Sequence, residues 1–299
     1  MIKVENIDVH GFEAAIRGMR NPKNSWGRSD SEIGKCNISG SYQCKNCAYK
    51  NVDSKVRVCI GSNDLDLMQR LYKGGTEHRK YLRMINVTMD ITAPLYWWKE
   101  FDTYKVGTVA NSCSTMHKIH DKEFMLEEDF SYEHLLGYNR ECMVDELGDD
   151  YYQDCPVDIL EQTIAMLNKA RELYLETKDK KYWWQMIQSL PTSYNQRRTV
   201  QLSYETVFNI IRQREHHKLD EWPQFVEILK QLPYVEELYE YGVNKYKELM
   251  NDIRTKAIDE FATTLIPRLT DAIYPQDVEG MTNLINDVAS ELKAGVKNE

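Results

Sequence analysis

The chain has 299 residues, a formal net charge of -9 at pH 7, and a composition of 42% hydrophobic and 28% charged residues. This length and composition allow one large domain or two small ones with a sizeable core, and they exclude wholesale disorder. The acidic balance argues against nonspecific nucleic-acid binding, which needs clustered Lys and Arg, and no run of about 18 apolar residues predicts a membrane span or a signal peptide.

The N-terminal region predicts a short strand over residues 3–9 and a helical turn or two over residues 11–18. Residues 19–31 then combine Pro, Gly, Asn and Ser, which disfavour regular structure, with Arg20, Trp26 and Arg28. Two interpretations remain open for this loop. It either binds a ligand through those three side chains, or it is a surface loop whose Trp26 is fixed to the core.

The chain has seven cysteines, an odd number that does not suit a disulfide framework. Their dispersed members, Cys113, Cys142 and Cys155, are typical of a reducing compartment and predict a cytoplasmic protein. Cys44-x-x-Cys47, in an insertion around residues 31–56, resembles a zinc knuckle that Cys36 and Cys59 would complete. The alternative is that all four are free thiols. Any zinc is expected to stabilise folding of residues 35–50 rather than to serve catalysis.

The middle of the chain alternates helix and strand signals. Residues 62–72 have helical spacing and end at Gly74-Gly75, whereas residues 81–91 alternate apolar and polar positions, which predicts a strand with one buried face. Pro94 begins an aromatic helix containing Trp97 and Trp98. Its apolar surface exceeds what one sheet face readily covers, which favours an oligomer.

Residues 103–116 predict a polar loop, and residues 127–152 have no clear period. A helical stripe follows Pro156, and Leu190-Pro191 ends the next helix. Residues 197–203 predict a strand, and residues 204–214 and much of 234–299 predict helices. The expected fold class is therefore α+β, with an antiparallel or mixed sheet flanked by helices. We expect a domain over 1–233 and a helical C-terminal extension over 234–299.

The order of several motifs resembles the flavin-dependent thymidylate synthase family. Arg57-Val58-Cys59-Ile60-Gly61-Ser62 resembles its Arg-Val-x-Tyr-x-Ser segment, and Gly75-Thr76-Glu77-His78 stands in place of its Gly-His-Glu-Ser turn. Ala93-Pro94-Leu95-Tyr96 follows in order, and Leu190-Pro191, the run 199–214 and Trp222 resemble its C-terminal motifs. The resemblance covers roughly residues 57–232.

The family's flavin signature, Arg-His-Arg-x-x-Ser-x-Asn-Glu-x-Ser-x-Arg, is altered in residues 103–116. Lys105 and Thr108 conservatively replace the Arg at the third position of the signature and its first Ser. Asn111 and Ser114 match the later Asn and Ser only with a one-residue slip, Ser112 replaces the Glu, and the last Arg is missing. Ser203 and Glu205 stand where the C-terminal motif has Asn and Arg. Several groups that hold flavin in the family are thus absent or reversed in charge.

Two classes of function follow from the resemblance. The first is a homotetrameric pyrimidine-nucleotide enzyme that transfers a methyl or one-carbon group to deoxyuridylate or a related nucleotide. The resemblance then implies FAD as hydride carrier, methylenetetrahydrofolate as carbon donor and NADPH as reductant, with no cysteine nucleophile. The second is a nucleotide-binding or regulatory protein that keeps the scaffold without flavin chemistry.

Arg214 is the first candidate site residue, because Val207 and Ile211 precede it by seven and three positions and place it on the apolar face of its helix. It either binds the phosphate of a pyrimidine nucleotide, as the family match implies, or forms a salt bridge with Asp220 or Glu221. The remaining candidates are assigned by the resemblance. The substrate would also contact Glu100, Asn111, Ser112 and Ser114, and the cofactor would contact His78, Lys105, Thr108 and His216. His217 is a further candidate ligand contact. The alternative for the residues after the aromatic helix is an ordinary loop, and the alternative for His216 and His217 is an exposed helix end.

Overall fold

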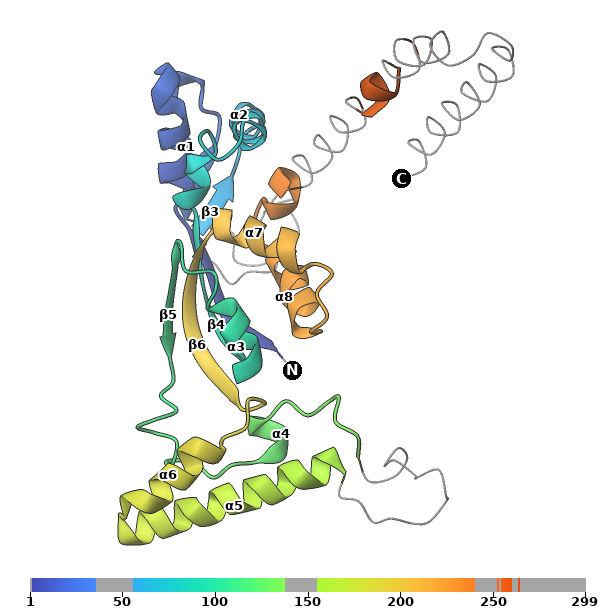
Figure 1. The fold of residues 1–299 in the computed structure, drawn as a ribbon. Helices are drawn as coiled ribbons and strands as arrows, with labels where there is room; N and C mark the ends of the chain where they lie inside the picture. The colour runs from blue at the N-terminus through green and yellow to red at the C-terminus, as the bar shows by residue number, and fades with distance from the viewer. Residues whose placement is uncertain are drawn as a thin grey trace, which may run out of the picture.

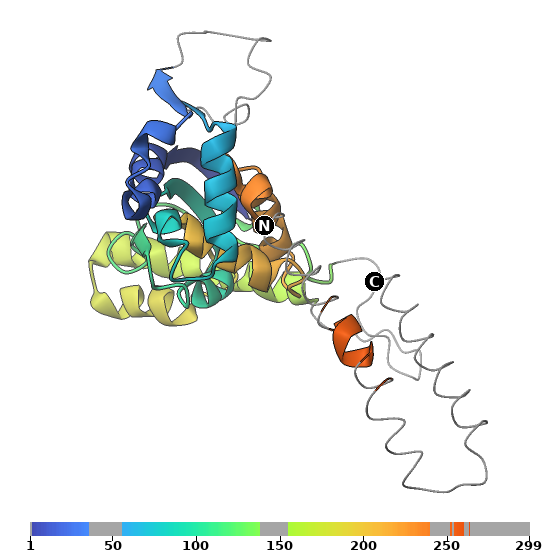
Figure 2. The same ribbon diagram turned by 90° about the horizontal axis from the view of Figure 1, so that it is seen from above.

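The computed structural model describes residues 2–35, 56–137 and 155–239, together with 252, 254–259 and 263. Figures 1 and 2 show the ribbon from two directions, with the central sheet between an upper group of helices that includes α1 and α2 and a lower group that includes α5 and α6.

The central sheet is antiparallel and has the strand order β1-β4-β6-β5. Its strands span Lys3–His10 (β1), Asn86–Pro94 (β4), Thr108–Ser112 (β5) and Asn195–Ser203 (β6). The alternation expected for β4 is present, because Val87, Met89 and Ile91 are buried while Thr88 and Asp90 between them are partly exposed. One face of the sheet therefore belongs to the core, and the other carries polar side chains.

The main core joins that buried face to the helices α1 (Phe12–Arg20), α2 (Ser62–Lys73), α3 (Leu95–Phe101), α7 (Tyr204–Arg214) and α8 (Glu221–Lys230). Gly11 allows α1 to begin close to the strand β4, since it adopts a φ of 98° and a Cβ there would lie 1.9 Å from the carbonyl oxygen of Met84. The ribbon β2 (Glu32–Lys35) and β3 (Val56–Cys59) forms a separate two-stranded sheet.

A second core lies under the sheet in Figure 1, where α5 (Pro156–Thr177) packs against α6 (Lys180–Ser189). The apolar stripe that predicted α5 is buried at Leu160, Ile164 and Leu167, and Met186 meets it from α6. The short helix α4 (Leu126–Asp129) and the chain around it complete this cluster. The described part of the chain contains no helix that is long and apolar enough to cross a membrane.

The sequence predictions agree with most of these elements, and α3 and α7 have the expected bounds. Two predictions were wrong in detail. Residues 103–116 do not form a loop throughout, because Thr108–Ser112 pairs with β6 as the edge strand β5. The strand predicted from residue 81 begins at Asn86, because Lys80–Arg83 forms a 3-10 turn that buries Tyr81 and Leu82. The mixed architecture of helices and an antiparallel sheet is the α+β class expected.

Candidate functional site

Five side chains from three helices and their connections meet at one end of α7, and we call them the Arg214 cluster. The cluster consists of Glu100, Tyr104, Arg214, His217 and Trp222. Glu100 stands in the last turn of α3 and Arg214 at the end of α7, while Trp222 opens α8. The apolar side chains of these three helices are buried in the main core. The polar groups of the cluster are therefore held at the border of that core.

Arg214 is fixed on three sides. Its Nη1 donates to Oε2 of Glu100 at 2.6 Å, and its Nε donates to the hydroxyl of Tyr104 at 3.0 Å. The guanidinium also lies over the indole of Trp222, with its central carbon 4.6 Å from the ring centroid, a cation–π geometry. The spacing predicted a place on the apolar face of α7, and the side chain is partly buried there, with 17% of it exposed.

Glu100 receives three contacts on the same oxygen. Besides Arg214, the indole Nε1 of Trp222 donates to Oε2 at 3.1 Å, and Nε2 of His217 lies 3.3 Å from it. Nδ1 of His217 accepts from the backbone N–H of Leu219, which fixes the imidazole beside the carboxylate. The carboxylate is therefore oriented by two hydrogen-bond donors, Arg214 and Trp222, with the imidazole of His217 next to the same oxygen.

Two polar atoms of the cluster have unused bonding capacity. Among the described residues no contact is made by Oε1 of Glu100 or by Nη2 of Arg214. The Glu100 side chain is 36% exposed. An acceptor and a donor carried by one ion pair can bind a ligand edge that presents the complementary donor and acceptor.

The alternative salt bridges of Arg214 are not formed. Asp220 lies 3.2 Å from His134, and the buried Glu221 accepts a hydrogen bond from the hydroxyl of Tyr96. Burial, followed by this carboxylate, raises the pKa of Tyr96. Arg214 is in an ion pair, but its partner is Glu100, another of the expected substrate-contacting residues.

The other side chains expected at the substrate lie along the edge strand and the turn after it. Asn111 and Ser112 pair with Thr199 and Arg198 of β6, and both are exposed. Ser114 accepts from the backbone N–H groups of Met116 and His117, as a turn residue does. No described contact joins Asn111, Ser112 or Ser114 to the Arg214 cluster.

The side chains expected at a cofactor are similarly separate. His78 and His216 are exposed, the first after α2 and the second after α7. Lys105 is exposed as well, whereas Oγ1 of Thr108 is buried and has no described hydrogen-bond partner. No described contact joins any two of these four side chains, and their assignment to a cofactor stays a prediction.

The zinc hypothesis falls mostly on residues outside the described ranges, which exclude Cys36, Cys44 and Cys47. Cys59 ends β3 opposite Glu32. Within the described ranges, no group of three or more His, Cys, Asp or Glu side chains is arranged to hold a metal ion. Cys155 is disulfide-bonded, which departs from the interpretation of dispersed cysteines as a sign of a reducing compartment.

Two residues of the cluster, Tyr104 and Trp222, were not assigned to a site from the sequence, whereas His217 was a candidate ligand contact. Tyr104 fell among the altered flavin positions, Trp222 served only as a family landmark, and His217 was left with an exposed helix end as its alternative. A usable signal was present, since Arg214 and Trp222 flank the short connection between two amphipathic helices. Residues at the facing ends of a helical hairpin lie close in space.

No protein-family model matches the sequence, and no curated protein matches it significantly. Solved structures do match. Thymidylate synthase X from Helicobacter pylori, crystallised with FAD and dUMP, is 15% identical with a TM-score of 0.50, and the match covers 80% of this chain and 97% of that one. A second structure of the same protein with FAD and dUMP has 16% identity, a TM-score of 0.49, and coverage of 80% and 98%.

The UMP/dUMP methylase PolB from Streptomyces cacaoi, bound with 5-Br dUMP, is 13% identical with a TM-score of 0.47, and the match covers 82% of this chain and 95% of that one. At 15% identity, the first Helicobacter structure establishes a similar fold, which supports the fold expected from the sequence motifs. Fold alone does not assign an activity.

Proposed function

We propose that this chain binds a pyrimidine nucleotide at the Arg214 cluster and acts as a nucleotide-modifying transferase of the flavin-dependent thymidylate synthase type. The observation that carries the proposal is the pair of polar atoms, Oε1 of Glu100 and Nη2 of Arg214, that make no hydrogen bond with any described residue. The dUMP bound by the similar Helicobacter protein is a nucleotide of this class.

Uracil has a hydrogen-bonding edge on which the N3–H donor lies between two carbonyl acceptors. Oε1 of Glu100 would accept from N3–H, and Nη2 of Arg214 would donate to a neighbouring carbonyl. This role differs from the phosphate contact expected from the sequence. A guanidinium already neutralised by a carboxylate at 2.6 Å attracts a phosphate dianion less than a free one does, whereas the pair suits a neutral base.

The same geometry favours uracil over cytosine. N3 of cytosine is an unprotonated acceptor, and it would face the carboxylate of Glu100 without a hydrogen between them. A site that leaves two acceptors opposed loses the bond and desolvates both atoms. Deoxyuridylate is therefore the preferred nucleotide, and the carbon acceptor in a methyl or one-carbon transfer.

The cofactor side of this proposal is open to direct test. FAD, if bound, would be held by His78, Lys105, Thr108 and His216, with folate and NADPH as further reactants and a homotetramer as the assembly. We derive no reaction step through FAD, because several groups of the family's flavin signature are absent or reversed in charge in this chain. That altered signature supports the second candidate, a nucleotide-binding or regulatory protein without flavin chemistry. The visible absorption spectrum of the protein with and without added FAD distinguishes the two.

The nucleotide site is tested by calorimetric titration of folded variants with dUMP and dCMP. We expect the wild-type chain to bind dUMP more tightly than dCMP. Glu100→Gln should weaken dUMP binding and reduce the preference for dUMP over dCMP, because a glutamine amide can turn its N–H toward N3 of cytosine. Arg214→Ala should weaken dUMP binding by about 2 to 3 kcal/mol, and Arg214→Lys by less, because it keeps the charge without the planar fork.

Arg212→Ala is the matched control. Arg212 stands two residues earlier on α7, is exposed, and bonds only to Asn209 among the described residues. We expect its dUMP affinity to equal that of the wild type. Unchanged dUMP affinity in folded Arg214→Ala would remove the nucleotide from this cluster.

A further inference from the structure

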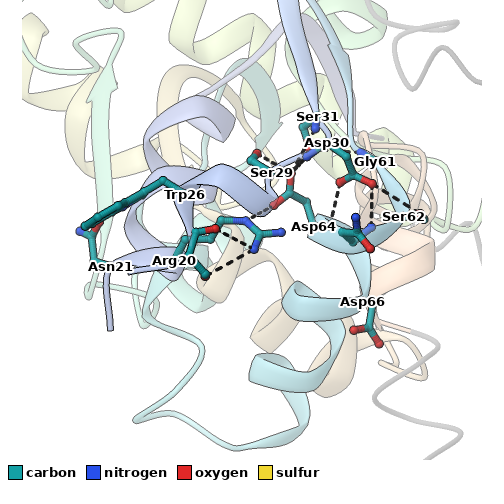
Figure 3. A network of polar contacts seen from close by, with 12 residues as sticks. Arg20, Asn21, Trp26, Ser29, Asp30, Ser31, Gly61, Ser62, Asp64 and Asp66 are labelled. Carbon is teal, nitrogen blue, oxygen red and sulfur yellow. Dashed lines mark hydrogen bonds and ion pairs between the residues drawn. The ribbon is translucent and has the colours of Figure 1, made fainter. Parts of the chain in front are cut away.

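A second polar region lies in the upper part of the molecule, between the loop that follows α1 and the helix α2. Figure 3 shows its centre, where Arg20 and the segment from Ser29 to Ser31 surround Asp64. Beside this centre lies a cavity of about 460 Å³, which we call the loop pocket. Residues 20–28 form one wall, and the α2 face that carries Asn63, Asp66, Leu67 and Arg70 forms the other.

Arg20 lines the loop pocket and is 4% exposed, so it is a buried cation. Its Nε donates to Oδ1 of Asp64 at 2.6 Å, and its Nη1 reaches the carbonyl and hydroxyl oxygens of Ser25 at 3.3 and 3.5 Å. Its Nη2 is buried and has no hydrogen-bond partner in the described part of the chain. A buried guanidinium nitrogen with unused donors is rare, since such groups are almost always bonded.

The charge around the loop pocket is opposite in sign to that of the whole chain. Arg20, Lys23, Arg28 and Arg70 line it, against the single carboxylate of Asp66, although the chain carries a net charge of -9. Asp66 is engaged by Arg70 at 2.7 Å. Lys23 and Arg28 make no ion pair with any described residue, so their charges are available.

We propose that the loop pocket binds the phosphate or diphosphate group of a small metabolite, as a site separate from the Arg214 cluster. Lys23 and Arg28 approach from the loop with charges that no described carboxylate pairs, and Arg20, whose own charge is paired with Asp64, stands in the wall beside them. The amide side chains of Asn24 and Asn63 add neutral donors. Several cations converging from two elements complement the multiple acceptor oxygens of phosphate better than the two oxygens of one carboxylate.

The size of the cavity indicates more than a free ion. Its volume falls within the range of about 300 to 1,000 Å³ that is usual for small-molecule sites, so the phosphate group has room for an organic remainder. Leu67 is the one apolar side chain among the described residues that line the pocket, and most of it is buried in the core. This inference does not depend on the function proposed for the Arg214 cluster.

The test is calorimetric titration of the full chain with inorganic phosphate and inorganic pyrophosphate at constant ionic strength. We expect saturable binding, with pyrophosphate bound more tightly. Lys23→Gln and Arg28→Gln should each weaken pyrophosphate binding by about tenfold, the effect of losing one charge-assisted contact. Both side chains are exposed and make no described bond, so these variants should fold, whereas replacing Arg20 would also leave Asp64 uncompensated.

Lys73→Gln is the matched control, because it makes the same charge change on α2 without lining the pocket. We expect it to change the pyrophosphate affinity by less than about twofold. Arg214→Ala should also leave that affinity unchanged. The proposal is overturned by a wild-type chain that shows no saturable binding, by a Lys73→Gln loss equal to that of Lys23→Gln, or by loss of binding in folded Arg214→Ala.

Discussion

Two arginine–carboxylate pairs have the same length and opposite surroundings. Arg20 and Arg214 each end a helix, and each donates to a carboxylate of another helix at 2.6 Å. The Arg20–Asp64 pair is almost fully enclosed, with 4% and 0% of the side chains exposed, whereas the Arg214–Glu100 pair is 17% and 36% exposed. The length of an ion pair therefore does not reveal how far the pair is enclosed.

The difference lies in what occupies the carboxylate oxygens. Oδ2 of Asp64 accepts from the hydroxyls of Ser29 and Ser31 at 2.7 and 2.6 Å and from the backbone N–H groups of Asp30 and Ser31. Asp30 in turn accepts from the backbone N–H groups of Asn63 and Asp64 at the start of α2. Loop and helix therefore bind each other reciprocally, while Glu100 keeps one oxygen open.

Removing Asp64 should have the largest effect on stability. Asp64→Ala leaves Arg20 buried without its partner and strips the serine hydroxyls of their acceptor, so we expect the free energy of unfolding to fall by about 3 to 5 kcal/mol. Asp66→Ala, further along the same helix, breaks only an exposed pair with Arg70 and should cost about 0 to 1 kcal/mol. Urea unfolding of both variants measures the contrast, and equal losses would contradict it.

The sequence predicted the parts of the fold that depend on local pattern. The alternation from Val87 to Ile91 and the stripe that includes Val207 and Ile211 are visible without tertiary information, because burial of one face repeats with the period of the element. The edge strand β5 could not be predicted in this way. Its residues are mostly exposed, so no apolar alternation indicates it, and its pairing with β6 is a nonlocal contact.

The candidate site was predictable only where a residue broke its own local pattern. Arg214 stands out as a cation on an apolar stripe, and its site role remains a proposal. Its partner Glu100 came from the family resemblance, and the contacts of His217 and Trp222 with that carboxylate depend on how α3 and α8 pack. Asp64 gave no signal, because an aspartate in the first turn of a helix is ordinary.

The loss of stability at low pH tests whether hydrogen bonds, rather than burial, stabilise the ionised carboxylates of this fold. Hydrogen bonds from Thr199, Asn6 and Arg197 hold the pKa of Asp90 at about 2, on the polar face of the sheet rather than in a closed site. Burial raises the pKa of Asp64, but hydrogen bonds from Ser31, Ser29 and Arg20 outweigh it and leave the pKa lowered.

Because the pKa of Asp90 is lower in the folded chain than its ordinary value of 3.8, its contribution is complete above about pH 4 and is lost as the pH falls through about 2. We expect Asp90 to contribute on the order of 1 to 2 kcal/mol to the fall in unfolding free energy at low pH. Thr199→Val removes the hydrogen bond that the Thr199 hydroxyl donates to Asp90. The decline in unfolding free energy between about pH 5 and pH 2 should therefore become shallower. An identical pH dependence in wild type and variant would refute the assignment.

Glu100→Gln should have a small effect on stability, and it tests the Arg214–Glu100 half of the comparison. The amide oxygen of glutamine can still accept from Arg214 and Trp222, so the substitution removes the charge while keeping the shape. Arg214 is partly exposed, and water can solvate the charge that the carboxylate no longer balances. We therefore expect the unfolding free energy to fall by about 1 kcal/mol, near the upper end for exposed ion pairs, with an unchanged urea m-value. A loss as large as that of Asp64→Ala would mean that the cluster holds the fold together as the Arg20–Asp64 pair does. Glu100 would then be a structural residue, and the change in dUMP-over-dCMP preference expected of Glu100→Gln would no longer follow from base recognition.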